Sequence, residues 1–151
     1  MEGLRVIVDI SGSMSALGKP AVVGNALTTL SLLPPEFGNV QLAKHSWNGQ
    51  MESLLTLLQQ DAGMPTLVLT DGFAFAEAGS SQERKLNEAF SSLKETLFVV
   101  LCGTDALSAS VLQKRYGVVQ SVAAENILYA VEVLSERCPE TAPENNEEDW
   151  Q

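Results

Sequence analysis

The order of hydrophobic and polar positions along the chain predicts short strands that alternate with amphipathic helices. Apolar runs with little internal periodicity are typical of strands buried on both faces of a sheet. Strong runs cover residues 4–9, 66–70 and 97–101, and two weaker strands are expected at 39–45 and 118–122. Two of the strong runs lead to a carboxylate, because Asp9 closes the first and Asp71 follows the second.

Between the strands, apolar residues recur three or four positions apart, which places them on one face of a helix. Helices are expected from Lys19-Pro20 to before Pro34, over 51–60, after the capping-box sequence Ser80-Ser-Gln-Glu83, over 106–115, and up to Pro139. This alternation predicts an α/β fold of three layers, with a doubly wound, mostly parallel sheet and helices on both faces. Ligands of such sheets bind where the strand order reverses, beyond the carboxyl ends of the strands. The strands that lead to Asp9 and Asp71 are expected to flank that point.

The chain divides into two segments of different composition. Residues 1–138 are expected to form one domain, since they contain neither a linker nor a repeat. Residues 139–151 are acidic and rich in Pro and Asn. They contain too few apolar residues to fold on their own, so we expect this tail to be disordered.

Composition narrows the classes of function. The hydrophobic fraction of 45% and the charged fraction of 19% are those of a soluble globular protein. No long apolar run and no signal peptide is evident, which predicts a cytoplasmic protein that does not enter a membrane. The 19 acidic and 9 basic residues give a net charge of −10, which disfavours nucleic acid and favours a cation or a basic partner. Cys102 and Cys138 form no spaced metal motif and are expected to be free thiols.

The loop after the first strand carries the main candidate for chemistry. In Asp9-Ile-Ser11-Gly-Ser13-Met, one carboxylate and two hydroxyls are spaced so that they can turn toward a common centre. Oxygen ligands suit a hard cation, and Mg²⁺ takes few protein ligands and keeps several waters. With Asp71 as a further carboxylate, the residues predict an open Mg²⁺ site, with Mn²⁺ or Ca²⁺ as alternatives. A simpler interpretation is that the two serines only cap a turn or a helix.

These motifs resemble the metal-ion-dependent adhesion site of von Willebrand factor A domains. The Asp-x-Ser-Gly-Ser-Met sequence after an N-terminal strand and Thr70-Asp71-Gly72 after a later one carry the resemblance, which covers residues 4 to about 138. It implies that Asp9, Ser11 and Ser13 hold the metal directly or through water, and that Asp71 holds it through water. It also implies a partner protein whose acidic side chain completes the metal shell, with AAA+ ATPases of the MoxR kind as one candidate.

The sequence departs from the family pattern at one ligand. The family has a threonine on an intervening loop, where this chain has the sequence Ser46-Trp-Asn-Gly-Gln50. Gln50 or Asn48 stands where the threonine is expected, and Ser46 is the nearest hydroxyl. The departure concerns the affinity for metal more than it concerns the fold.

Binding fits these residues better than catalysis does. The sequence has no evident Ser-His-Asp set and no Walker-type phosphate loop, so we expect no enzyme, with a metal-dependent hydrolase as the weakest hypothesis. The main hypothesis is an adaptor that binds a partner carboxylate through the metal. The alternative is a degenerate scaffold that binds without metal through the aromatic residues Trp47, Phe73 and Phe75, which could instead belong to the core. Asp105, at the end of another strand, could line the same edge or cap a helix.

Overall fold

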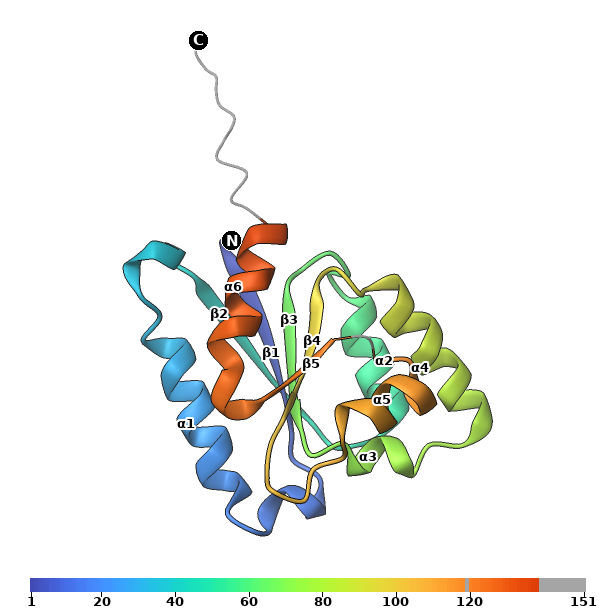
Figure 1. Ribbon diagram of the computed structural model, residues 1–151. Helices are drawn as coiled ribbons and strands as arrows, with labels where there is room; N and C mark the ends of the chain where they lie inside the picture. The colour runs from blue at the N-terminus through green and yellow to red at the C-terminus, as the bar shows by residue number, and fades with distance from the viewer. Residues whose placement is uncertain (119, 139–151) are drawn as a thin grey trace.

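Five parallel strands form one sheet in the order β2-β1-β3-β4-β5 in the computed structural model, which describes residues 1–118 and 120–138 (Figure 1). The strands are β1 (Gly3–Asp9), β2 (Gln41–Trp47), β3 (Thr66–Thr70), β4 (Leu97–Leu101) and β5 (Ser121–Ala123). The helices are α1 (Lys19–Ser31), α2 (Met51–Gln59), α3 (Phe73–Ala76), α4 (Ser80–Ser92), α5 (Ala109–Tyr116) and α6 (Ile127–Arg137). Short 3₁₀ turns cover Gly12–Ser15, Pro35–Phe37 and Ala124–Asn126. The expected three-layer α/β fold is confirmed, and the predicted tail at 139–151 lies outside the described residues.

The strand order reverses at β1. From β1 the chain passes outward to β2 at the edge and then returns to β3 on the other side of β1. The register pairs Asp9 with Trp47 and Val8 with Leu69, so the carboxyl ends of β1, β2 and β3 lie at one edge of the sheet. Asp9 and Asp71 therefore flank the reversal point, as the sequence predicted.

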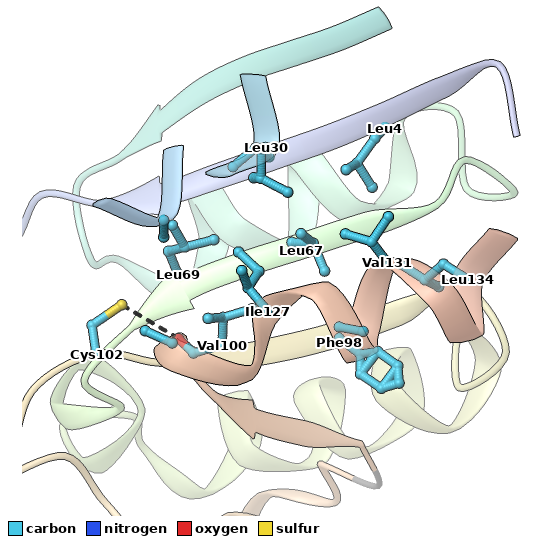
Figure 2. Packing of buried hydrophobic residues seen from close by; sticks show 14 of the residues in the cluster. Leu4, Leu30, Leu67, Leu69, Phe98, Val100, Cys102, Ile127, Val131 and Leu134 are labelled. Atoms are coloured by element: carbon cyan, nitrogen blue, oxygen red, sulfur yellow. Dashed lines mark hydrogen bonds between the residues drawn. The ribbon is translucent and has the colours of Figure 1, made fainter. Parts of the chain in front are cut away.

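Two hydrophobic cores lie on opposite faces of the sheet. Helices α1 and α6 cover one face, where aliphatic side chains from β1, β3 and β4 meet Leu30, Val131 and Leu134 (Figure 2). Helices α2, α3, α4 and α5 cover the other (Figure 1). That second core contains an aromatic cluster in which the ring of Phe75 lies 5.8 to 5.9 Å from those of Trp47, Phe90 and Tyr116.

A buried arginine ties β1 to the end of α2. Arg5 donates from Nε to Thr66 Oγ1 at 3.0 Å and from Nη1 to the carbonyls of Leu57, at 2.6 Å, and Gln60. Those carbonyls belong to the end of a helix, where they lack partners within the helix. Arg5 thus serves as a C-terminal cap supplied from a distant strand.

Some predicted boundaries are wrong for local reasons. The predicted capping box at Ser80-Ser-Gln-Glu83 does not form, because the N-cap is Gly79, which has no side chain to cap the helix; its N–H donates to Gln82 Oε1 at 3.1 Å. Helix α5 begins later than position 106, since the Ser108 hydroxyl caps it by accepting from Val111 N at 3.2 Å. Strand β5 also begins later, because the N–H of Val118 still bonds to the carbonyl of Leu112 in the preceding helix.

No helix among the described residues is both long and apolar enough to span a membrane.

Candidate metal centre

The Asp9 carboxylate lies at the end of β1 and is only 1% exposed. Its Oδ1 accepts a hydrogen bond from Ser11 N at 2.8 Å, and its Oδ2 accepts one from Thr70 Oγ1 at 2.7 Å. The Thr70 hydroxyl in turn accepts from Gly72 N at 3.0 Å, which fixes its orientation. The carboxylate is therefore oriented by donors from both strand ends and retains lone pairs for a further ligand.

The hydroxyl of Ser11 is the unsatisfied group of this loop. Its Oγ is buried and has no hydrogen-bond partner among the described residues. The loop after β2 closes over it, since a Cβ on Gly49, whose φ is +91°, would lie 2.8 Å from Ser11 Cβ. Buried polar atoms nearly always have a partner, so the Ser11 hydroxyl, next to the Asp9 carboxylate, is placed to meet a ligand.

The loop at residues 46–50, where the family has its threonine, does not supply the threonine's hydroxyl. Ser46 is exposed on β2. Asn48 Oδ1 accepts from Gln50 N at 3.0 Å, and the Gln50 carbonyl accepts from the indole of Trp47 at 2.7 Å. The threonine hydroxyl at the candidate site is instead that of Thr70, which donates a hydrogen bond to Asp9.

Asp71 is fully buried and faces a lysine. Its Oδ1 accepts from Phe73 N at 3.0 Å, and its Oδ2 accepts from Lys19 Nζ at 2.9 Å. Lys19 Nζ also lies 2.9 Å from Asp105 Oδ1 and donates to the carbonyl of Ser13 at 3.2 Å. The predicted ligand Asp71 is thus at the expected sheet edge, but its carboxylate is already paired with an ammonium.

The environment of Lys19 keeps it charged. Burial alone would lower its pKa, but hydrogen bonds and charges from Asp105 and Asp71 outweigh this and raise the pKa above its ordinary value. The ammonium also lies 4.8 Å from the centre of the Phe73 ring, a distance typical of a cation–π contact. Lys19 is therefore a permanent positive charge inside the site at neutral pH.

The sequence analysis missed Lys19 as a site residue and left the role of Asp105 open. Asp105 lines the edge, and the cap of α5 is Ser108. A signal for Lys19 was present, because it is spaced four, seven and eleven residues from Val23, Ala26 and Leu30 and so lies on the apolar face of its helix. Its partners could not be inferred, since they are 52 and 86 residues away.

The aromatic residues divide between core and site. Trp47 and Phe75 are buried in the second core, so the core interpretation is correct for both. Phe73 is half-buried against Lys19. A metal-free surface made of these three rings is therefore contradicted for Trp47 and Phe75.

Two exposed apolar side chains lie in the segment between β1 and α1. Ile10 is 61% exposed and Leu17 is 69% exposed, and Leu17 has a φ of +54°, which is unfavourable for a side chain of its size. Ile10 lines a cleft of about 410 Å³ between the end of β1 and α1, together with Asp9, Ser11 and Leu27. Polar ligand atoms and an apolar rim are thus adjacent.

Cys102 follows β4 and is buried in the first core (Figure 2), and its N–H donates to the carbonyl of Thr70 at 3.0 Å. Burial, together with the charges of Asp71 and Asp9, raises the pKa of its thiol to about 12. The thiol therefore stays protonated at neutral pH and is a poor metal ligand. Both cysteines are free, as predicted.

The residues present fit a hard cation in part. Among the described residues there is no group of three or more His, Cys, Asp or Glu side chains that could hold a metal ion. A site here would consist of the Asp9 carboxylate with serine hydroxyls, an oxygen set that suits Mg²⁺ with several waters. The buried, unpartnered Ser11 hydroxyl fits this set, while the Lys19–Asp71 pair reduces the contribution of Asp71.

Comparisons of the chain with models of protein families, with curated proteins and with solved structures found no match.

Proposed function

We propose that this domain is a cytoplasmic adaptor that binds an acidic side chain of a partner protein through a divalent cation, in the manner of the von Willebrand factor A domains that its motifs resemble. Mg²⁺ is the proposed ion, with Mn²⁺ or Ca²⁺ as alternatives. The observation that carries the proposal is the buried Ser11 hydroxyl, which has no partner among the described residues and lies beside the oriented carboxylate of Asp9.

Each site residue has a distinct proposed role. Asp9, Ser11 and Ser13 hold the cation, and Thr70 orients Asp9 through its hydrogen bond of 2.7 Å. The resemblance assigns Asp71 a contact through water, but pairing with Lys19 reduces its proposed share. The cation supplies positive charge and open coordination positions that a partner carboxylate can fill.

Charge supports a role for the cation in partner binding. The chain carries a net charge of −10, which repels an acidic partner at long range. A divalent ion at the sheet edge offsets this repulsion where the partner docks. The exposed side chains of Ile10 and Leu17 supply apolar area beside it, as docking surfaces commonly do.

The partner class follows from the resemblance alone. AAA+ ATPases of the MoxR kind are the proposed candidates, and binding rather than catalysis is the proposed activity. A cytoplasmic setting agrees with the two free thiols, since disulfides are rare in reducing compartments.

A peptide selection tests the proposal without a known partner. Peptides displayed on phage are selected on the immobilised protein in millimolar Mg²⁺ and then eluted with EDTA. We expect the eluted peptides to share an Asp or Glu, and to lose binding when that residue becomes Asn or Gln. They should also fail to bind Asp9→Ala, whereas the matched control Glu88→Ala, an exposed acidic residue on α4, should bind as the wild type does.

One observation favours a metal-free alternative. The ammonium of Lys19 already pairs with Asp71, which the cation-dependent proposal assigns to the ion, so this edge is satisfied in part with no added ion. Selected peptides that bind equally well in Mg²⁺ and EDTA would establish that alternative and overturn the cation-dependent proposal. Their contact surface would then include Ile10 and Leu17 rather than the buried rings.

A further inference from the structure

The slot that holds Lys19 is built by residues from three segments. The side chain is 1% exposed, and its Nζ reaches Asp71 after β3, Asp105 after β4 and the Ser13 carbonyl. Glycine is needed at position 103, because its φ is +103° and a Cβ there would lie 2.7 Å from Lys19 Cε. A long charged side chain therefore fills a space shaped for it.

The charges around this slot resemble those of a site that already holds one cation. Asp71 and Asp105 direct carboxylate oxygens at a single ammonium, at 2.9 Å each. Asp9 lies at the same edge of the sheet, so Lys19 is the one ammonium near several carboxylates. Without Lys19 this edge would have a stronger negative field.

We propose that Lys19 is an internal cation that competes with a divalent ion for Asp71 and thereby sets how tightly this sheet edge binds metal. The inference deepens the proposed function and rests on it, since both concern the same site. While the ammonium holds Asp71, the ion relies on Asp9 and the serine hydroxyls. Without the ammonium, the buried carboxylate of Asp71 becomes available, and Asp105, whose side chain is 32% exposed, is left unpaired beside it.

A purely structural ion pair makes a different prediction. If Lys19 only stabilises the fold, its removal lowers stability and leaves cation affinity unchanged or weaker. If Lys19 competes with the ion, its removal lowers stability in EDTA and raises cation affinity. Cation affinity therefore distinguishes the two roles, whereas folding stability does not.

The test is calorimetric titration of Mn²⁺ into the wild type, Lys19→Met and Lys19→Gln. Lys19→Gln retains N–H donors for the carboxylates and serves if the methionine variant does not fold. We expect either variant to bind Mn²⁺ roughly tenfold more tightly or better, because one nearby positive charge is gone. Lys114→Met, at an exposed lysine on α5, is the matched control and should change affinity by less than about twofold, since exposed distant charges are screened.

A variant that is expected to change Mn²⁺ affinity in the opposite direction completes the test. Asp105→Asn removes a negative charge but leaves the Lys19–Asp71 pair, so Mn²⁺ affinity should fall. Equal or weaker binding by the Lys19 variants, or unchanged or tighter binding by Asp105→Asn, would overturn the inference. If the wild type binds no Mn²⁺ and a Lys19 variant does, the inference stands and the cation-dependent function proposed above falls. If the wild type binds and a Lys19 variant binds equally, the function stands and the inference falls.

Discussion

Replacing Lys19 by methionine in metal-free buffer is expected to destabilise the fold strongly. The substitution keeps the length of the side chain but removes the charge that pairs with Asp71, which is fully buried. Within the described part of the chain, only the N–H of Phe73 would then remain as a hydrogen-bond donor to that carboxylate. Breaking a buried pair by removing one partner typically costs about 3 to 5 kcal/mol, a large part of the roughly 5 to 15 kcal/mol that holds a domain folded.

The structure also predicts an asymmetry between the two partners. In Asp71→Asn, Lys19 keeps the carboxylate of Asp105, which is partly exposed. Its loss should therefore be smaller, about 2 kcal/mol. Because the two side chains interact directly, the double variant Lys19→Met with Asp71→Asn should lose less than the sum of the single losses, by about 1 to 3 kcal/mol.

Urea unfolding followed by circular dichroism in EDTA measures these free energies. The control Lys114→Met, on the surface of α5, should stay within about 0.5 kcal/mol of the wild type. Losses in the two single variants that simply add in the double variant would refute the reasoning. So would a larger loss for Asp71→Asn than for Lys19→Met.

Three further predictions concern groups outside the site. Tyr116→Phe removes a buried hydroxyl that has no partner among the described residues, so stability should be unchanged or higher by up to about 1 kcal/mol in calorimetry. Arg5→Leu leaves the last carbonyls of α2 without their donor, and the free energy of unfolding in urea should fall by about 2 to 3 kcal/mol; no loss would show that water replaces the guanidinium. Because the folded pKa of Cys102 is about 12 and the unfolded value is about 8.5, its thiol contributes stability that is complete below the unfolded value and is lost as pH rises toward 12. As the pH rises from about 8.5 to about 11, the free energy of unfolding of Cys102→Ala should therefore fall less than that of the wild type. Equal falls in the two proteins would show that the Cys102 thiol is not the cause.

The strands could be predicted because each depends on a local pattern, whereas their order in the sheet could not. The runs at 66–70 and 97–101 were predicted with the bounds that β3 and β4 have, since a strand buried on both faces has few polar positions. The helix at 73–76 was missed, because four residues give no periodicity and aromatic residues after a glycine also suit a loop.

The site could be predicted only in part. The spacing of Asp9, Ser11 and Ser13 is local, and the carboxyl ends of parallel strands bring Asp71 to the same edge. Which donors hold each carboxylate depends on contacts between distant segments, and the sequence cannot supply these. Lys19 is the main example, since its two acidic partners come from different loops.

The proposed function requires that Asp9 and its neighbouring hydroxyls bind a divalent cation. Thermal unfolding of the wild type and of Asp9→Ala, each with millimolar Mn²⁺ and with EDTA, tests this directly, since an ion that binds only the folded state must stabilise it. We expect Mn²⁺ to raise the unfolding temperature of the wild type and to leave that of Asp9→Ala unchanged. An equal response of both proteins, or no response of the wild type, would contradict it.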